Sequence, residues 1–494
     1  MFKQPQLESV KAWLAHPAHA AMPLHARIQR AIRRLILDGA LGPGKPLPAS
    51  RALAKSLGVS RDTIEAGYAQ LHAEGFIDRR VGSGSFVAQM AEFTPGRGLS
   101  QRNARNQAPN LSKRGNAMFR SGGVRELLAP RPFAHGMPET RSFPLPLWER
   151  LQRQVLKETG TQALLHGDPQ GAEPLRRAIA DYVNLERGGR ATADRVLILT
   201  SSQQALTLCA NLLLDPGDRI FIEDPAYYGA RKAFDAADLE CVPVRVDRQG
   251  IVVERVTAES RKVKAVYLTP SHQFPTGATL ALDRRLALIE WAARHQTWII
   301  EDDYDSEFHY AGKPTACVQG LDPHDRTIYI GTFTKSLFPG LRIGYVVLPL
   351  QLVKPMSVAR TLFDGHSAPM AQLTLARFME GGHFGTHVRA MRGIYAERLD
   401  VLATLVRKRL SNFVEARVPV GGLQMPCVLT CDMSERTAID AARRVGIELL
   451  GLSALHVAGN GKAGFLMGFA AYTPTEIEVA IVKLANALRS VTKP

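Results

Sequence analysis

The sequence has no continuous apolar stretch near the roughly 20 residues that a membrane-spanning helix needs, because charged residues interrupt every apolar run. Residues 1–22 also lack the apolar core of a signal peptide. We therefore expect no membrane association and a location in the cytoplasm.

Cysteine is scarce as well, with five among 494 residues. They are Cys209, Cys241, Cys317, Cys427 and Cys431, an odd number of which only the last two lie close together. This usage excludes a disulfide-dense scaffold and favours buried, reduced thiols over disulfides or a metal site.

Acidic residues are few in residues 1–131, which contain 20 Lys and Arg against 8 Asp and Glu. This segment therefore carries 12 of the net 16 positive charges of the chain. A length of 494 residues with 45% hydrophobic residues predicts at least two domains. The charge distribution indicates that the N-terminal domain faces a negatively charged partner such as nucleic acid.

Helical periodicity in the basic segment predicts a compact DNA-binding domain. Apolar residues at helical spacing predict a supporting helix over 24–37. A second, short helix is expected over 50–58, and a third over 60–75 with Ser60 as its N-cap. Two short helices joined at Gly58 are typical of a helix-turn-helix, whose second helix places its first turn in the major groove. That turn holds Ser60, Arg61 and Thr63, whose side chains can bind a guanine edge or phosphates.

Residues 76–87 have the alternating pattern of a hairpin with a glycine-rich tip at 82–84, which predicts a basic wing with Arg79 or Arg80 near the DNA. The segment 23–88 resembles the winged-helix domain of the GntR superfamily. The resemblance implies double-stranded operator DNA as partner, contacted by Arg51, Ser60, Arg61, Thr63 and Gly82. The predicted wing adds Arg80 to these DNA-binding residues. A small helical interaction module with the same packing is the alternative.

Apolar periodicity disappears after residue 88, and Arg, Asn, Gln, Ser and Gly dominate up to residue 130. We interpret 1–22 as an N-terminal extension, 23–88 as the DNA-binding domain, 89–130 as a basic flexible linker and 131–494 as the effector and dimerisation domain. A linker of this composition spans on the order of 36 Å as a random coil and about 140 Å when extended.

The remaining chain alternates helical patterns with short apolar strands. The strands are expected at 196–200, 219–223, 263–269, 297–301, 327–331 and 343–348. This alternation predicts an α/β domain with a mostly parallel sheet, so that polar residues at the strand ends gather around a ligand.

Lys335 follows one such strand, and Asp302 ends the neighbouring strand 33 residues upstream. An aspartate can keep a pyridine nitrogen protonated while a lysine forms a Schiff base with the cofactor aldehyde. Residues 201–204 open a helix whose amides and hydroxyls can bind phosphate, to which Arg342 can add a guanidinium. Tyr227 offers an aromatic face to the pyridine ring.

This order and spacing resemble the fold-type I pyridoxal-phosphate enzymes, the aspartate aminotransferase superfamily, over about residues 130–494. The resemblance implies pyridoxal 5'-phosphate bound as an aldimine to Lys335, with Asp302 on the pyridine nitrogen, Tyr304 near the ring hydroxyl and Tyr227 stacked on the ring. It places Ser202, Gln203, Thr332, Thr334 and Arg342 around the phosphate. A winged helix joined to this domain resembles the MocR subfamily of GntR regulators, to which the runs 269–277 and 301–308 are also similar.

Three positions depart from the enzyme pattern. Phe274 replaces an asparagine, so the ring oxygen loses a donor unless His272 or Gln273 supplies one. His166 replaces a tyrosine that in the enzymes reaches the phosphate of the partner subunit. Leu466 stands where aminotransferases place the arginine that binds the substrate α-carboxylate. Leucine cannot bind a carboxylate, which disfavours ordinary amino-acid transamination.

We therefore expect a DNA-binding transcriptional regulator that binds pyridoxal phosphate and senses this cofactor, or an amino-acid or amine effector. The missing arginine favours pyridoxal phosphate itself or a ligand with a different acid group, such as taurine. The resemblance further implies a homodimer, arranged head-to-tail with swapped DNA-binding domains, and an operator of two half-sites. The alternatives are a catalytically active aminotransferase fused to a DNA-binding domain and a scaffold that binds neither ligand.

Overall fold

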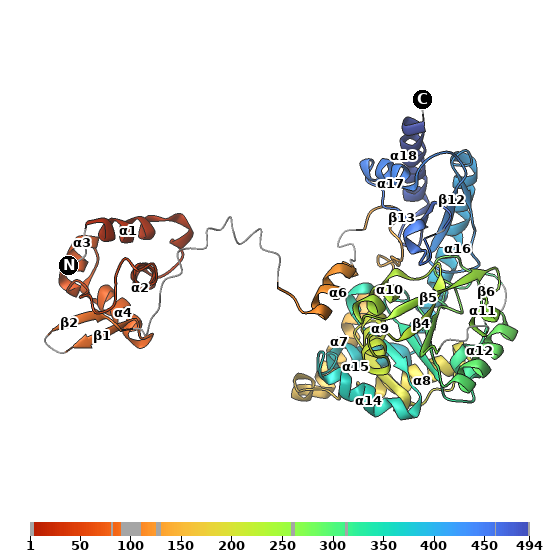
Figure 1. The fold of residues 1–494 in the computed structure, drawn as a ribbon, viewed down its shortest axis with the longest axis horizontal. Coiled ribbons are helices and arrows are strands. Elements are labelled where there is room, and N and C mark those ends of the chain that lie inside the picture. The colour runs from red at the N-terminus through yellow and green to blue at the C-terminus, as the bar shows by residue number, and fades with distance from the viewer. Residues whose placement is uncertain are drawn as a thin grey trace. The chain divides into compact units, whose positions relative to one another are not determined.

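The computed structural model describes residues 4–80, 83–89, 110–124, 130–257, 262–311, 315–459 and 461–492. The chain divides into two compact units, Met1–Asn110 and Leu111–Pro494 (Figure 1). The division falls inside the interval 89–130 that the sequence predicted as a linker.

The described part of the first unit consists of short helices and a hairpin. Its elements are α1 Gln4–Ala15, α2 Leu24–Leu37, α3 Ser50–Leu57, α4 Arg61–Ala73, β1 Ile77–Arg80 and β2 Gly84–Val87. The helices and the hairpin predicted from the sequence are therefore confirmed within one or two residues. Helix α1, which the sequence left as an extension, packs on α2 and buries Val10.

The apolar faces of α2 and α4 form the core of this unit, and α3 packs on α4. Tyr68 of α4 is buried and its hydroxyl donates to the Pro48 carbonyl at 2.8 Å, which fixes the loop before α3. Helix α3 ends at Gly58, whose φ of 67° is the left-handed conformation that glycine adopts without strain. The tight turn between α3 and α4 depends on that glycine.

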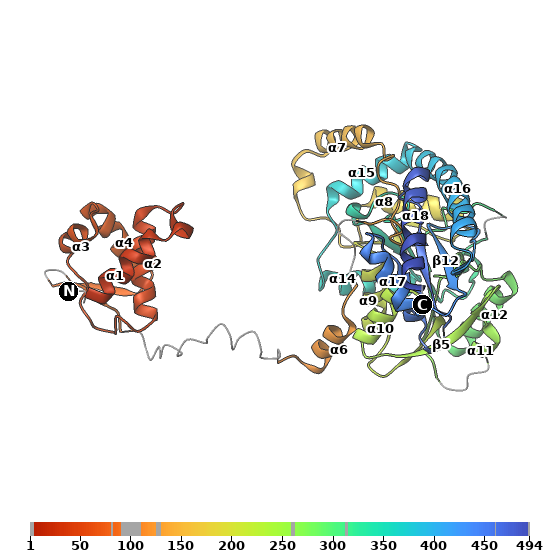
Figure 2. The ribbon, with the colours of Figure 1, turned by 90° about the horizontal axis from the view of Figure 1, so that it is seen from above.

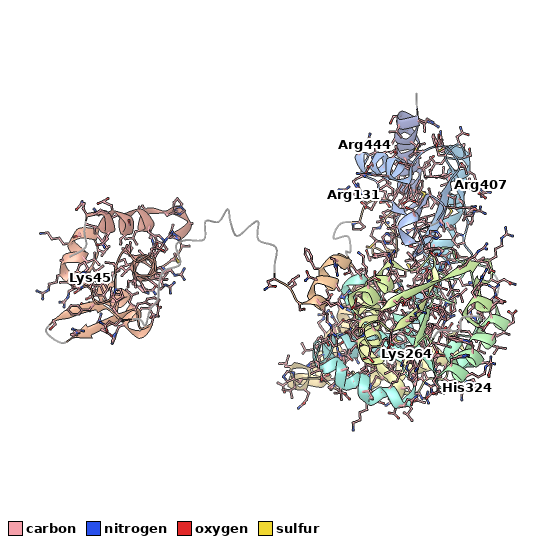
Figure 3. All side chains as sticks on the ribbon, in the orientation of Figure 1. Lys45, Arg131, Lys264, His324, Arg407 and Arg444 are labelled. Carbon is pink, nitrogen blue, oxygen red and sulfur yellow. The ribbon has the colours of Figure 1, made fainter. Side chains whose placement is uncertain are left out.

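A third extended segment joins the wing. Leu47 N–H donates to the Ser85 carbonyl at 2.8 Å, and Val87 N–H donates to the Lys45 carbonyl at 2.9 Å. Lys45, labelled in Figure 3, is exposed beside β2. The hairpin is thereby anchored to the segment that precedes α3.

The second unit is built around a sheet of order β3-β10-β9-β8-β7-β4-β5-β6. Its strands are β3 Val196–Leu199, β4 Arg219–Asp224, β5 Glu240–Asp247, β6 Gly250–Ile251, β7 Ala265–Leu268, β8 Trp298–Asp303, β9 Thr327–Thr332 and β10 Gly344–Val347. Strands β5, β4, β7, β8 and β9 are parallel, whereas β10 runs antiparallel to β9 and β3. The six predicted strands and the mostly parallel α/β fold are confirmed.

Helices cover both faces of this sheet because its strands are apolar on both sides. Leu197 and Leu199 of β3 face the core shared with α9, α10 and α14, whereas Val196 and Ile198 face the core shared with α7, α8 and α15. Helices α11, α12 and α13 cover the remaining strands. The helices are α7 Leu145–Thr159, α8 Glu173–Arg187, α9 Ser202–Leu213, α10 Tyr228–Ala236, α11 Val253–Thr257, α12 Leu282–His295, α13 Val318–Leu321, α14 Leu350–Thr361 and α15 Pro369–Glu380.

The C-terminal part of this unit carries a smaller antiparallel sheet of order β11-β12-β14-β13. Helices α16 and α18 pack side by side in this C-terminal part (Figure 2), and they share its hydrophobic core with α17. Its elements are α16 His383–Arg409, β11 Val414–Ala416, β12 Gln424–Leu429, α17 Glu435–Arg444, β13 Leu450–Gly451, β14 Gly464–Gly468 and α18 Pro474–Thr492.

The predicted linker contains a helix, α6 Lys113–Ser121, which packs against α10. Ser112 caps it by accepting from the Gly115 N–H at 3.0 Å, and Gly122 ends it with a φ of 71°. The prediction of a flexible linker over all of 89–130 is therefore wrong for 113–121. Although the composition is polar, this segment has a serine cap at its start and a glycine at its end, which are the signals of a helix. Residues 90–109 and 125–129 lie outside the described ranges.

The segment that enters the second unit is tied to the C-terminal sheet and helices. Gly468 N–H donates to the Phe133 carbonyl at 2.9 Å, and Glu448 N–H donates to the Pro132 carbonyl at 3.0 Å. The buried Glu139 forms an ion pair of 2.8 Å with the buried Arg398 of α16. Residues 132–139 are therefore held in place from several sides.

All five cysteines are free thiols. In the described ranges no helix combines the length and the apolar character that crossing a membrane requires.

Candidate cofactor site and DNA interface

A cavity of about 580 Å³ lies in the second unit. Its walls come from the ends of β8 and β9, from the starts of α9 and α10, from residues 135–137 and from residues 423–424. Parallel strands present their carboxyl ends at one edge of a sheet, so residues far apart in sequence converge there. The predicted cofactor residues Lys335, Asp302, Tyr304, Tyr227, Ser202, Gln203, Thr332, Thr334 and Arg342 all line this cavity.

Lys335 extends from the loop after β9, and its Nζ donates to the Gly136 carbonyl at 2.6 Å. Gly136 has a φ of 66°, and a Cβ at this position would lie 2.8 Å from the Lys335 Nζ. Only glycine therefore allows this approach without displacing the lysine. The lysine is thus held against the segment that follows the linker.

Asp302 ends β8 and is buried with its carboxylate at the cavity wall. Tyr267 of β7 donates its hydroxyl to Asp302 Oδ2 at 2.9 Å, whereas Oδ1 is buried with no hydrogen-bond partner among the described residues. Burial raises the pKa of Asp302 from 3.8 to about 7. A buried acceptor without a partner is costly, so this position favours a ligand with a positively charged donor.

Hydroxyls and amides gather where the sequence predicted phosphate binding. Ser201 caps α9 by accepting from the Gln204 N–H at 3.2 Å, so the following residue opens the helix at the cavity. The Thr332 and Thr334 hydroxyls lie 3.0 Å apart at the end of β9. Arg342 lines the same cavity from a left-handed backbone position with a φ of 53°. A helix N-terminus with hydroxyls and a guanidinium is suited to a phosphate group.

His272, expected as a donor to the ring oxygen, is not among the residues that line this cavity. It lies behind Tyr304 and Asp305, with Nδ1 3.1 Å from the Tyr304 hydroxyl and 3.1 Å from the Asp305 carboxylate. Gln273 is buried elsewhere and donates to the Pro225 carbonyl at 2.8 Å. His272 therefore contacts Tyr304 and supports it from outside the cavity.

Several lining residues escaped the sequence analysis, among them Asp305, His135, Leu423 and Gln424. Asp305 lies three residues after Asp302, a spacing that could have pointed to it. The others come from irregular segments or from the start of β12, where no motif marks them. Burial, with a contribution from Lys335, lowers the pKa of His135 to about 4, so its imidazole is neutral at neutral pH.

The three residues that depart from the aminotransferase pattern lie in three different environments. Phe274 lines the cavity and packs against Tyr227 with a ring separation of 5.6 Å. Leu466 of β14 is fully buried in an apolar cluster with Phe274, Leu452 and Leu455. His166 is exposed at the surface, where its Nδ1 lies 3.1 Å from His366 Nε2.

The candidate DNA interface lies at the start of α4 and at the wing. Ser60 caps α4 by accepting from the Thr63 N–H at 3.2 Å, and Arg61 is exposed in the first turn. Arg51 of α3 is exposed as well, and the Arg80 guanidinium lies 4.9 Å from the centre of the Phe86 ring in the wing. Gly82 lies outside the described residues.

Comparison with known proteins agrees with both units. Residues 24–87 match the family model for bacterial regulatory proteins of the gntR family, and residues 139–484 match aminotransferase class I and II. The chain is 34% identical over 473 residues to a probable rhizopine catabolism regulatory protein, MocR, of Rhizobium meliloti, covering 95% of this chain and 94% of the relative. It is 27% identical over 472 residues to the pyridoxine biosynthesis transcriptional regulator PdxR of Corynebacterium glutamicum, covering 95% and 97%.

Among solved structures, kynurenine aminotransferase of Pyrococcus horikoshii superposes with a TM-score of 0.69 at 25% identity, over 80% of this chain and 98% of that one. The two units thus define a helix-turn-helix regulator that carries an aminotransferase-like domain. More specifically, the chain belongs to the MocR-type GntR regulators.

The cofactor that this fold and these residues define is pyridoxal 5'-phosphate. The residues fit it: Asp302 Oδ1, which has no hydrogen-bond partner among the described residues, suits a pyridinium N–H, and Lys335 suits the aldehyde. The hydroxyls at the starts of α9 and the loop after β9, with Arg342, suit the phosphate. When bound, the cofactor supplies an aldehyde that condenses reversibly with primary amines.

Replacing Asp302 with asparagine tests both the cost of burying this carboxylate and its contribution to cofactor binding. The pKa of Asp302 is raised on folding, so in the cofactor-free chain this group costs stability as pH rises from about 4 to about 7. We predict that the Asn variant without cofactor is more stable than wild type at pH 8 and equally stable near pH 4, measured by thermal unfolding. Loss of the charged hydrogen bond should weaken pyridoxal phosphate binding about tenfold or more in equilibrium dialysis.

The outcome that contradicts this assignment is a variant that binds pyridoxal phosphate as tightly as wild type. Asp325→Asn serves as the matched control, because this carboxylate is partly exposed and pairs with Arg195 away from the cavity.

Proposed function

We propose that this chain is a transcriptional regulator that binds pyridoxal phosphate covalently at Lys335 and converts the binding of the cofactor, or of an amine that reacts with it, into a change in DNA binding. The main support for the proposal is that the cavity is lined both by a residue within the linker and by a residue just after it. They are Val124, just after α6, and Gly136, which accepts from Lys335. We place this regulator in the cytoplasm because it acts on DNA.

The linker side of the cavity is attached to α10. Helix α6 packs on α10, Lys113 pairs with Asp238 at 3.3 Å, and Lys232 of α10 donates to the Gly123 carbonyl at 2.5 Å. Tyr228, the first residue of α10, lines the cavity beside these contacts. A ligand that displaces Tyr228 or the backbone of 122–124 would therefore move the linker segment that leads back to the DNA-binding unit.

Lys335 supplies the second connection. Its Nζ donates to Gly136, whose segment is anchored to the small sheet through Phe133 and to α16 through the Glu139–Arg398 pair. If the cofactor took up the lysine amine, this hydrogen bond would change, and release of the lysine would restore it. Sensing requires only that the two arrangements differ in affinity for the ligand.

The DNA-binding role rests on the exposed first turn of α4 and on the excess of positive charge in residues 1–131. In this proposal Arg61 reads base edges, whereas Arg51, Ser60, Thr63, Arg80 and Gly82 contact the backbone or the minor groove. Lys45 adds a positive charge beside the wing.

The second candidate function is an active aminotransferase fused to the DNA-binding unit. The presence of Lys335 and Asp302 in one cavity favours it, because both groups are needed for pyridoxal phosphate chemistry. Leu466, which the resemblance to aminotransferases places where those enzymes carry a carboxylate-binding arginine, opposes it and is fully buried. Steady turnover of an amino acid with an oxo-acid would establish this candidate.

We also propose a homodimer, arranged head-to-tail with each DNA-binding unit packed on the opposite subunit. The supporting feature is a set of exposed apolar side chains within four residues, along the chain, of the two histidines of the His166–His366 contact, namely Leu164, Leu165, Leu362 and Phe363. Leu362 is 85% exposed and Leu164 75% exposed. Grouped exposed apolar residues of this kind mark interaction surfaces, and a two-fold dimer would bind an operator of two half-sites.

Arg61→Ala tests the DNA interface. Removing a base-reading arginine should cost about 1–3 kcal/mol of specific binding, measured by fluorescence anisotropy on a sequence selected by the full chain from random DNA. Arg34→Ala is the control, because Arg34 is exposed on α2 away from the first turn of α4. Equal losses in the two variants would remove Arg61 from the interface.

Leu362→Asp tests the dimer surface. A buried unpaired carboxylate on each side of a two-fold contact should shift the chain from dimer to monomer, measured by light scattering. Val479→Asp is the control, because Val479 is half exposed on α18. A Leu362→Asp chain that stays dimeric would show that this surface is not the subunit contact.

A further inference from the structure

The charges in the cavity restrict which amines it can accept. Among the described residues that line it, the acids are Asp302 and Asp305, and the permanent cations are Lys335 and Arg342. In the proposed function, Lys335, Asp302 and Arg342 are engaged by the cofactor. His135 is neutral at neutral pH because burial and Lys335 lower its pKa to about 4. The remaining acidic or basic group of the described cavity wall is Asp305, which is paired with His272.

Asp305 is held firmly at that wall. It is buried, and His272 Nδ1 lies 3.1 Å from both of its carboxylate oxygens. Gly422 allows this pairing, because a Cβ there would lie 2.2 Å from the His272 ring and 2.8 Å from Asp305 Oδ2. The carboxylate cannot turn away from the cavity without breaking the contact with His272, so at this wall it offers a hydrogen-bond acceptor to an amine and no cationic partner to an acid.

The wall behind Phe274 is apolar. Phe465 and Met467 of β14 face the core of the C-terminal part, whereas Leu466 between them faces the opposite way, toward Phe274, Leu452 and Leu455. Tyr227, Tyr228 and Tyr304 pack against the same cluster. A carboxylate placed against this wall would lose its water, and none of the described residues that form the wall is a cation, so its burial there is costly.

We propose that the ligand sensed beside the cofactor is a primary amine with an apolar tail and no acid group. This inference rests on the proposed function. The amine nitrogen replaces the Lys335 amine at the aldehyde carbon of the cofactor, so that one carbon–nitrogen double bond is exchanged for another and Lys335 leaves as a free amine. The exchange consumes no oxidant or reductant. The freed Nζ can then donate to the Gly136 carbonyl, the contact present in the structure.

Matched pairs that differ only in the carboxylate test this proposal. The full chain loaded with pyridoxal phosphate is titrated with phenethylamine against L-phenylalanine, and with n-butylamine against L-norvaline, followed by the visible absorbance of the bound cofactor and by thermal stability. Each amine should bind about tenfold or more tightly than its amino acid. Equal or tighter binding of the amino acids, or tighter binding of the aminosulfonate taurine, would overturn the proposal.

Leu466→Arg provides the converse measurement, since it adds the missing guanidinium to the wall. It should raise the affinity for L-phenylalanine about tenfold or more relative to phenethylamine, whereas Leu466→Met should keep the wild-type preference. Retained cofactor absorbance shows that each variant folds. If a variant does not fold, the titration of the wild-type chain alone decides whether amines are preferred over amino acids. A wild-type chain without cofactor absorbance contradicts the proposed function and this inference together, whereas a loaded chain that prefers amino acids contradicts the inference alone.

Discussion

The hydrogen bond from Lys335 Nζ to the Gly136 carbonyl joins the two parts of the second unit on which the proposed sensing depends. Lys335 belongs to the loop after β9 of the large sheet, whereas Gly136 belongs to a segment fixed to the small sheet and to α16. The same segment continues the chain from the linker. A change in the hydrogen bonding of Lys335 would therefore affect the contacts of this segment with the C-terminal part, and it would also affect the linker that leads to the DNA-binding unit. The absence of a Cβ at Gly136 makes this approach possible.

Buried acids are the second constraint. Burial raises the pKa values of Asp302, Glu223, Glu301 and Glu307 to about 7, so the cofactor-free unit holds several carboxyl groups in unfavourable surroundings. Asp302 faces the cavity with one oxygen unpartnered among the described residues. A cationic ring nitrogen at that point would relieve this cost, which ties the stability of the unit to cofactor binding. The site is thus organised for a charged ligand before one arrives.

Sequence patterns were sufficient for the elements and motif residues that depend on local periodicity. The strands predicted at 327–331 and 297–301 are present, and because parallel strands end at one edge, Lys335 and Asp302 share a cavity. The roles of these side chains toward the cofactor stay predictions. The sequence could not place His135, Leu423 or Gln424, which reach the cavity through long-range packing without a motif. It also predicted His272 inside the cavity, whereas the structure puts Tyr304 and Asp305 in front of it.

If the state of the cavity sets DNA affinity, the affinity of the full chain for its selected DNA should depend on the ligand. We would measure this affinity without cofactor, with pyridoxal phosphate, and with pyridoxal phosphate plus phenethylamine. We expect at least one addition to change the affinity about tenfold, within the usual range of coupling between sites. Lys335→Ala should abolish this change and keep the cofactor-free affinity. An affinity that is the same in all three states would contradict this expectation and would leave the aminotransferase-like unit without a sensory role.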